Sequence, residues 1–372
     1  MCYILFGSKL MRMKAVLLLV TLVVAGVVLS CGGNGGGGGG NSTHAAYVTV
    51  PQDNQVVGFH INDTSGKLNP VAGSPFASGV SPAAVCVHPS GQFVYVANQG
   101  EQTVSLFTIG SDKALQEVTP RATTGLNPTA LTTDPTGSFL FVANQGTNDI
   151  SVFSISSADG TLTEIGGSRF KAGLGPSRLV VSAGGTFLYV ANQNSLSLSI
   201  FSIAPGAGTL TEVLPPVNLT SAPLAMTIGP SGQYLYVTLP AANGFTGFSI
   251  DAGTGALTSI TPTPFTAGTS PVGIILDPSG QFLYVANMGT NNVFTYTVDA
   301  LTGLPTQDTT ASAGTGPVFL AMTPAGDFLY VGNQGSKNIS GFTRDATTGK
   351  LTAVTDSPFS TGSAPSSMFI TP

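Results

Sequence analysis

The sequence feature that most constrains this chain is a unit of about 47 residues that occurs seven times. An aromatic residue opens a short β-type run at intervals of 46 to 48 residues, and a second aromatic residue follows each one twelve positions later. A proline also precedes each of seven apolar runs. The first set of aromatic markers comprises Tyr47, Tyr95, Phe141, Tyr189, Tyr236, Tyr284 and Tyr330. Self-similarity at this period indicates a repeat architecture in which each unit packs against its neighbours.

The unit that begins at Pro128 predicts four short strands separated by turns. Residues 134–137 read Asp-Pro-Thr-Gly, a turn in which proline presets φ and glycine is free to take positive φ. Residues 144–146 begin a loop, and residues 159–160 form a hairpin turn. The predicted strands cover 131–133, 139–143, 150–155 and 162–165. Four strands in a unit of this length are typical of one blade of a β-propeller.

The two ends of the chain complete one blade between them. The chain stops after a first strand at 368–372, and the repeats start at His44, just before a second strand. The predicted fold is therefore all-β: a single seven-bladed β-propeller over 44–372, with four-stranded antiparallel blades. The C-terminal strand is expected to join the N-terminal strands and leave no open edge. The inner-strand positions predicted to supply the core are Val85, Leu131, Leu179, Met226, Ile274, Leu320 and Met368.

Composition agrees with this fold and excludes other classes. Only 8% of the residues are charged, 42% are hydrophobic, and there are 48 glycines and 25 prolines. A disordered chain would carry more charge, and a helical bundle would contain less glycine and proline. The formal net charge is −5, and a protein that binds the phosphate backbone needs the opposite balance. Nucleic acid is therefore not expected as a partner.

The N-terminal residues predict export. Arg12 and Lys14 precede an apolar run over 15–29, which is the pattern of a secretory signal peptide. Residues 28–31 resemble a bacterial lipobox, and this resemblance implies a signal peptide over 1–30 and lipid attachment at Cys31. Residues 31–43 are rich in glycine and are expected to form a tether. The predicted location is the cell envelope, in the periplasm or at the cell surface; an ordinary signal peptide with a chance cysteine is the alternative.

The repeated units resemble those of a known family. Residues 277–298 (DPSGQFLYVANMGTNNVFTYTV) and 45–59 (AAYVTVPQDNQVVGF) are similar to the seven-bladed lactonases, which include 6-phosphogluconolactonase, and to YVTN-repeat propellers. In the lactonases an inner strand opens with Gly-Pro-Arg-His, and the next strand ends in Val-Asn-Glu. Here residues 175–178 read Gly-Pro-Ser-Arg and residues 191–193 read Ala-Asn-Gln. The resemblance therefore places Arg178 where the family has histidine and Gln193 where it has glutamate.

Residues for catalysis or metal binding are scarce. The three histidines, His44, His60 and His88, occupy turn or outward strand positions and have no metal-like spacing. Asp134 and Asp277 open equivalent turns, where aspartate caps the backbone. Neither a G-x-S-x-G nor an H-E-x-x-H motif occurs. No metal or cofactor is therefore expected.

One group of residues predicts a binding site. In a four-stranded blade, the loops after the second strands share a face with the blade-to-blade connections. That face would hold Arg178, the one charged residue in the seven predicted inner strands, with Gln145, Asn192 and Gln193. Arg121 and Lys171 would join them from the connections and complete a basic, amide-rich pocket for a carboxylate, phosphate or sugar. The alternative is scattered solvated charge, with Arg178 paired locally.

Two functions remain open from the sequence. The first is a non-catalytic binding or scaffolding module, because the histidine and glutamate of the lactonases are replaced. The second is a lactone hydrolase for a sugar or organic-acid lactone, with Arg178 as the candidate catalytic residue and no base identified. The expected partner is a small anionic or sugar ligand or an envelope protein. Membrane contact is expected only through a lipid on Cys31, and the protein is expected to be a monomer.

Overall fold

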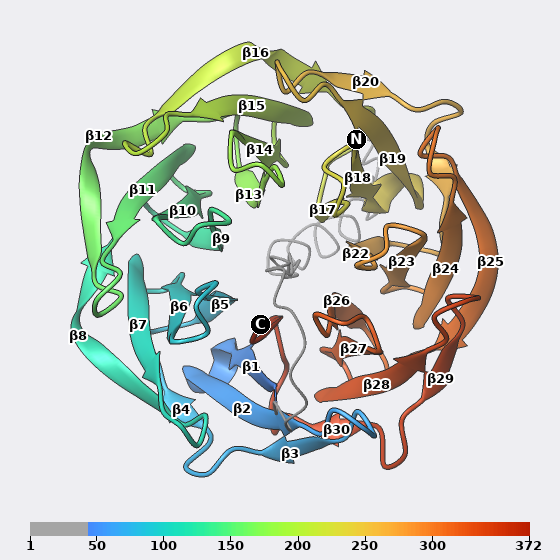
Figure 1. Cartoon of the computed structure of the whole chain (residues 1–372), viewed down its shortest axis with the longest axis horizontal. Helices are drawn as coiled ribbons and strands as arrows, with labels where there is room; N and C mark the ends of the chain where they lie inside the picture. Colours follow the sequence, from blue (N-terminus) through green and yellow to red (C-terminus); the bar gives the residue numbers. More distant parts are fainter. Residues whose placement is uncertain (1–43) are drawn as a thin grey trace, which may run out of the picture.

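The computed structural model describes residues 44–372, with the side chains of 167 and 168 left out, as a ring of seven antiparallel sheets around a central axis (Figure 1). The predicted signal peptide, the glycine-rich tether and the lipidation site Cys31 lie outside the described residues. Three blades have a split outer strand. Blade 1 contains β31 (Ser367–Ile370), β1 (Ala45–Val50), β2 (Gln55–Ile61), β3 (Leu68–Pro70) and β4 (Phe76–Ala77). Blade 5 contains β17 (Met226–Ile228), β18 (Tyr234–Leu239), β19 (Gly244–Ile250), β20 (Leu257–Ser259) and β21 (Phe265–Thr266). Blade 7 contains β26 (Pro317–Met322), β27 (Phe328–Asn333), β28 (Asn338–Arg344), β29 (Leu351–Ala353) and β30 (Phe359–Ser360).

The other four blades have one continuous outer strand each. Blade 2 contains β5 (Pro82–Val87), β6 (Phe93–Asn98), β7 (Thr103–Ile109) and β8 (Leu115–Thr123). Blade 3 contains β9 (Pro128–Thr133), β10 (Phe139–Asn144), β11 (Asp149–Ile155) and β12 (Leu162–Lys171). Blade 4 contains β13 (Pro176–Val181), β14 (Phe187–Asn192), β15 (Ser197–Ile203) and β16 (Leu210–Asn218). Blade 6 contains β22 (Pro271–Leu276), β23 (Phe282–Asn287), β24 (Asn292–Val298) and β25 (Pro305–Ser312).

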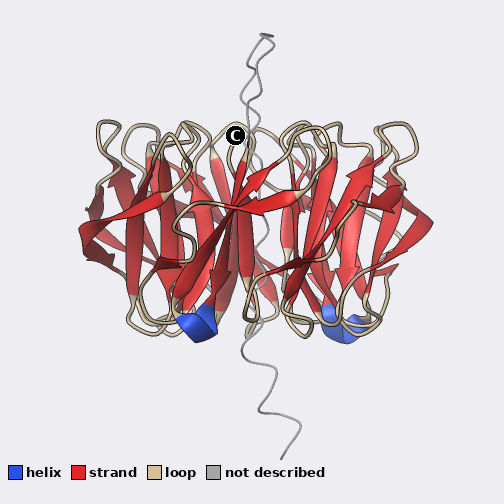
Figure 2. Ribbon diagram, turned by 90° about the horizontal axis from the view of Figure 1, so that it is seen from below, coloured by secondary structure: helices blue, strands red, loops and turns tan. Residues whose placement is uncertain are grey.

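The ring has two faces with different loops. The turn face carries the turns between the first and second strands and between the third and fourth strands. The connection face carries the loops between the second and third strands and the connections from one blade to the next. The short 3-10 helices η1 (Pro51–Asp53) and η2 (Pro240–Ala242) lie on the connection face, opposite the C-terminus (Figure 2). No helix among residues 44–372 is long and apolar enough to cross a membrane.

The ring closes as the sequence predicts. The C-terminal strand β31 pairs antiparallel with β1, with Met368 opposite Val48 and Ile370 opposite Ala46. The side chain of Thr49 also hydrogen-bonds Ser366 at 2.8 Å. Because residues 317 positions apart in the sequence complete one sheet, the first and last blades are joined like any other pair.

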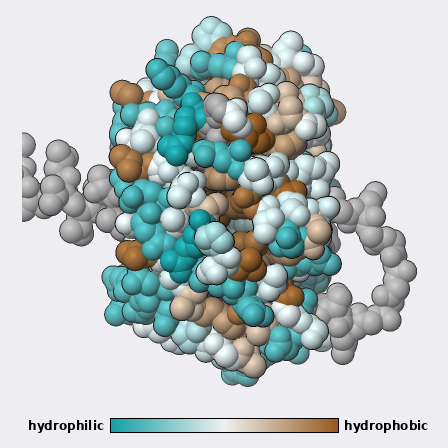
Figure 3. Space-filling view, turned by 90° about the vertical axis from the view of Figure 1, so that its left-hand side faces the viewer, coloured by the Kyte–Doolittle hydropathy of each residue, from teal (hydrophilic) through white to brown (hydrophobic). Residues whose placement is uncertain are grey.

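Apolar residues form a cluster at each blade-to-blade contact. Six of the seven predicted inner-strand core positions are buried, while Leu131 is only partly buried. The outer strand β8 mixes buried, partly buried and exposed residues without a regular alternation. The side of the ring near β8 and β12 accordingly shows both hydrophilic and hydrophobic patches (Figure 3). The core of the molecule therefore lies between the blades, toward the inner three strands of each.

A ladder of tyrosines links neighbouring blades on the turn face. In six blades the second strand carries a buried tyrosine whose hydroxyl donates to a backbone carbonyl in the third-to-fourth-strand turn of the next blade, at 2.6 to 3.0 Å. Tyr330 closes the ladder by donating to Gly66 O of blade 1. Blade 3 has Phe141 at this position, and no tyrosine hydroxyl reaches Gly208 O. The repeated aromatic residue thus packs in the core and, where it is tyrosine, hydrogen-bonds the next blade.

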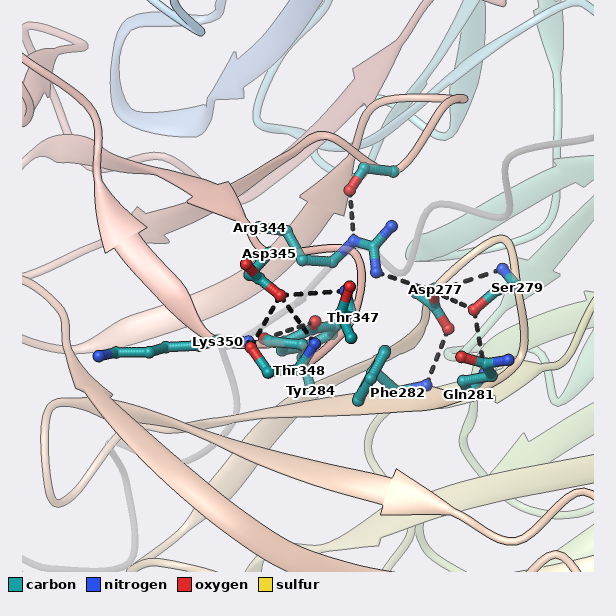
Figure 4. Close-up of polar contacts among 12 residues, drawn as sticks. Asp277, Ser279, Gln281, Phe282, Tyr284, Arg344, Asp345, Thr347, Thr348 and Lys350 are labelled. Atoms are coloured by element: carbon teal, nitrogen blue, oxygen red, sulfur yellow. Dashed lines mark hydrogen bonds and ion pairs between the residues drawn. The ribbon is translucent and has the colours of Figure 1, made fainter.

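Polar side chains also join the turns of adjacent blades. Asp277 caps its turn by accepting hydrogen bonds from Phe282 N and Ser279 N. Arg344 of β28 lies 3.3 Å from the same carboxylate and donates to Gly326 O, so its buried guanidinium connects blades 6 and 7 (Figure 4). Asp134 caps the equivalent turn of blade 3 through Phe139 N. The predicted capping role of both aspartates is confirmed.

His88 replaces the turn-opening aspartate in blade 2. Its Nδ1 accepts the amide hydrogen of Ser90, which leaves Nε2 to donate to Gly137 O of blade 3 at 2.9 Å. The histidine is thus a structural bridge between two turns. Cys86 of β5 is also buried, with 3% of its surface exposed.

Candidate functional site

Arg178 is the one charged residue on the seven inner strands, and it is buried. It lies on β13 opposite Ala191 and is 3% exposed. Successive side chains of a strand point to opposite faces, and Val180 of the same face packs against Met226 and Ile228 of blade 5. The side chain of Arg178 therefore leaves β13 on the side of blade 5, close to the connection face.

The guanidinium of Arg178 is only partly satisfied. Nη1 donates to Ser177 O at 2.5 Å, whereas Nε and Nη2 are buried and have no hydrogen-bond partner. Arg178 forms no ion pair within residues 44–372. Burial without a counter-charge lowers the pKa of the guanidinium to about 9, so the group is still a cation at pH 7. Two unused donors on a buried cation are the arrangement that a bidentate anion would complete.

The surroundings of Arg178 differ from those at the other blade contacts. The positions equivalent to Arg178 in blades 3 and 5 hold Ala130 and Ala225, so only a methyl group leaves the inner strand there. In blades 2, 3, 4, 6 and 7 the inner strand begins at its proline. In blade 5 the inner strand β17 begins three residues after Pro223, and blade 1 is the other exception. The regular blade geometry is therefore interrupted beside Arg178.

Two glutamines meet on the connection face of blades 3 and 4. Gln145 Nε2 donates to Gln193 Oε1 at 3.3 Å, and both side chains are half-buried. Gln193 N also donates to Gly175 O, which ties its loop to the start of β13. The structure thus brings Gln145 and Gln193 together at the end of the blade that carries Arg178, as the sequence predicts.

Asn192 has a structural role in this arrangement. Its Nδ2 donates to the hydroxyls of Ser197 and Ser199, and the residue is fully buried. The same clamp holds the second strand to the third in other blades, from Asn98, Asn144, Asn287 and Asn333. Because the repeated asparagine fixes the loop in each case, Asn192 positions Gln193.

Arg121 and Lys171 do not join the site. Both lie on outermost strands, β8 and β12, and Arg178 lies on an innermost strand. The four strands of a blade span roughly 14 Å, at about 4.8 Å between neighbours. Lys171 is exposed, and Arg121 contacts Glu117 and Glu101, each at 2.7 Å. The expected cluster of three basic residues is therefore wrong, and Arg178 is the one cation of the site.

The carboxylates around Arg121 hold it firmly. The Glu117 hydrogen bonds raise the pKa of Arg121 above its ordinary value. Burial of Glu101 opposes its ionisation, but hydrogen bonds from Thr103, the Val80 backbone and Arg121 outweigh that effect and lower its pKa. Arg121 thus neutralises two carboxylates on the rim of the ring and is not available to a ligand.

Exposed apolar residues of the connection face were missed in the sequence. Val80, Leu126 and Leu174 stand two positions before the inner-strand prolines of blades 2, 3 and 4 and are 48%, 53% and 57% exposed. The other four blades have serine or threonine there: Ser221, Thr269, Thr315 and Ser363. Aligning the seven units at their prolines would have shown this contrast. We call Val80, Leu126 and Leu174 the apolar arc.

The arrangement around Arg178 provides a buried cation without a paired acid or base in the described part of the chain. Neither a carboxylate nor a histidine pairs with Arg178 in the described part of the chain, and Gln193 cannot take up a proton as a carboxylate does. Within residues 44–372 no three His, Cys, Asp or Glu side chains are grouped to hold a metal ion. The site can therefore attract and orient negative charge through Arg178.

Similar proteins share this architecture. The chain resembles the crystal structures of 6-phosphogluconolactonase candidates from Bacteroides fragilis (22% identity, TM-score 0.76, 89% of this chain and 99% of that one) and Bacteroides uniformis (21%, 0.78, 88% and 99%). It is also similar to the periplasmic gluconolactonase of Pseudomonas aeruginosa (20%, 0.74, 89% and 99%). A search of curated proteins gave no match. The profile described as "Lactonase, 7-bladed beta-propeller" matches residues 40–174, 165–263 and 258–367, and the chain therefore belongs to the lactonase family of seven-bladed β-propellers.

Proposed function

We propose that this protein binds a small carboxylate- or phosphate-bearing ligand between blades 4 and 5, with Arg178 as the anchor. The observation that carries the proposal is the buried Arg178 guanidinium with two unused donors and no ion pair in the described chain. An unpaired buried charge is costly, and a bidentate anion would supply both the counter-charge and the missing hydrogen bonds. The Gln145–Gln193 pair would offer amide groups to the rest of the ligand.

Hydrolysis of a lactone is the second candidate, and membership of the lactonase family favours it. In that reaction Arg178 would polarise the carbonyl oxygen, and a water molecule would need a base. Gln193 stands where the family pattern has glutamate, and the described residues pair no other base with Arg178. Binding without turnover therefore has the better support.

Calorimetric titration of purified 44–372 tests the binding proposal. The probes are gluconate, 6-phosphogluconate and inorganic phosphate, and the variants are Arg178→Met and the matched control Arg169→Met. Arg169 is an exposed arginine of β12. We expect binding by the native protein and by the control, and at least a hundredfold loss in Arg178→Met, because a charged hydrogen-bonding pair is removed. Equal binding by all three proteins, or by none, would overturn the proposal.

The hydrolase alternative has its own readout. Gluconolactone opening followed at constant pH would show turnover above the buffer rate that disappears in Arg178→Met. Binding without such turnover would assign the protein to the non-catalytic function, and turnover would assign it to the enzymes.

We also propose that the protein is exported and anchored at the cell envelope through Cys31. The signal-like run over 15–29 and the lipobox-like residues 28–31 support this. Labelling with a fatty-acid analogue in bacterial cells should mark the native chain and not Cys31→Ser. Labelling of both, or of neither, would refute lipid attachment. His44 directly precedes β1 and so lies on the turn face, and the proposed Arg178 site would lie near the opposite face.

A further inference from the structure

We infer that the anion bound at Arg178 carries an apolar body, an aliphatic or aromatic carboxylate and not a polyhydroxylated sugar acid. This inference rests on the proposed function, because it concerns the chemistry of the same ligand. It is drawn from the apolar residues of the connection face, which the anchoring role of Arg178 does not require.

The apolar arc follows the loops that carry the two glutamines. Gly146 N donates to Leu126 O and Gln145 N donates to Asn127 O, so Leu126 lies beside the glutamine loop of blade 3. Asn194 N donates to Leu174 O, which gives blade 4 the same arrangement. The contact between Gln145 and Gln193 joins the two loops. Leu126 and Leu174 thus flank the polar pair on neighbouring blades.

Leu196 adds a further apolar group between blades 4 and 5. It is 39% exposed and has a φ of 50°, in the left-handed region that leucine disfavours. The equivalent Asn148 of blade 3 has the same backbone conformation and accepts a hydrogen bond from Gly175 N of the next blade. Leucine at this position cannot accept that hydrogen bond. It places an apolar side chain between blades 4 and 5, on the side toward which Arg178 points.

The balance of polar and apolar groups selects the ligand class. A sugar acid presents a hydroxyl on almost every carbon, and each one taken out of water needs a partner. The guanidinium and the glutamine pair supply few such partners, and the leucines of the two adjacent blades supply none. They match one anionic head and a hydrocarbon body, for which each methylene group removed from water strengthens binding about fourfold.

The deciding experiment compares hexanoate with gluconate, because both have six carbons and one carboxylate. Calorimetric titration uses the native protein, Leu174→Ser and the control Leu301→Ser. Serine is the residue at this position in blades 1 and 5, and Leu301 is 90% exposed on the turn face. We expect native protein to bind hexanoate at least tenfold more tightly than gluconate. Leu174→Ser should lose five- to tenfold in hexanoate affinity and nothing in gluconate affinity, and Leu301→Ser should lose neither.

The outcomes separate the two proposals. Equal affinity for both anions, or unchanged hexanoate binding in Leu174→Ser, overturns the apolar ligand class, provided that Arg178→Met abolishes binding. If neither anion binds, or if Arg178→Met binds like the native protein, the anion site itself is refuted. Tighter binding of gluconate than hexanoate would place the ligand among the sugar acids.

Discussion

Replacing Arg178 by methionine should stabilise the ligand-free protein. Methionine keeps an unbranched side chain in the space of Arg178 and removes a buried charge that has two unused donors. Burial lowers the pKa of the Arg178 guanidinium from its ordinary value to about 9, which corresponds to roughly 5 kcal/mol against the charged form. Relaxation around the charge and the smaller volume of methionine reduce the gain, so we expect about 1–4 kcal/mol. Removal of the proposed ligand anchor would thus strengthen the fold.

The pH dependence of this gain follows from the direction of the pKa shift. The folded state releases the Arg178 proton at lower pH than the unfolded state, so the native protein gains stability as pH rises above about 9. Below about pH 9 the cost of the buried charge is fully present. The advantage of Arg178→Met should therefore be complete at pH 7 and smaller at pH 10.5.

Urea denaturation at pH 7 and pH 10.5 measures both effects. The control Arg169→Met removes an exposed arginine and should change the free energy of unfolding by no more than about 0.5 kcal/mol. A destabilised Arg178→Met, or a gain that is the same at both pH values, would show that the guanidinium is not an uncompensated buried cation. Arg178 would then have no need of a bound anion to offset its charge.

Four further substitutions test other parts of the structure by the same denaturation assay. Phe141→Tyr should add the missing rung of the tyrosine ladder toward Gly208 O and stabilise by about 1 kcal/mol, and no gain would mean that the hydroxyl does not reach the carbonyl. Tyr95→Phe removes a 2.8 Å hydrogen bond to Gly160 O and should cost about 1–2 kcal/mol. Asp277→Asn leaves Arg344 buried without its counter-charge and should cost about 3 kcal/mol, part of which Arg344→Met should restore. Leu196→Asn relieves a left-handed leucine and should stabilise by about 1 kcal/mol; a loss would show that the leucine packs favourably in the free protein.

The sequence predicts the ring well because each blade repeats the same strands, turns and apolar positions. The Asp-Pro-x-Gly turns, the alternation of the third strands and the ends that complete one sheet all depend on local patterns or on counting. Leu131 departs from its equivalents in being partly exposed, although it packs against the apolar cluster between blades 2 and 3. The outer strand of blade 3 continues to Lys171, beyond the predicted end at residue 165.

The failure at Arg121 has a physical reason that sequence alternation cannot show. In a regular strand, residues four apart are separated by roughly 13 Å. In β8 the register shifts, so residues 118 to 122 lie opposite 104 to 106 of β7, and the extra residues bulge. The bulge brings Glu117 within 2.7 Å of Arg121, and Glu101 approaches from the neighbouring loop. The pairing of Arg121 thus arises from a backbone irregularity, whereas Arg178 was recognisable as the one charge on the inner strands.

Departures from the repeat indicate where the proposed site lies, because the repeated residues themselves account for stability. The asparagine clamp, the tyrosine ladder and the aspartate turn cap recur from blade to blade, and each satisfies buried polar groups. Arg178, Leu174 and Leu196 differ from the small or polar residues at most equivalent positions. Each works against the free protein, through an uncompensated charge, exposed apolar surface or a left-handed leucine. All three lie on blade 4, and one amphipathic anion would offset the charge and the exposed surface together.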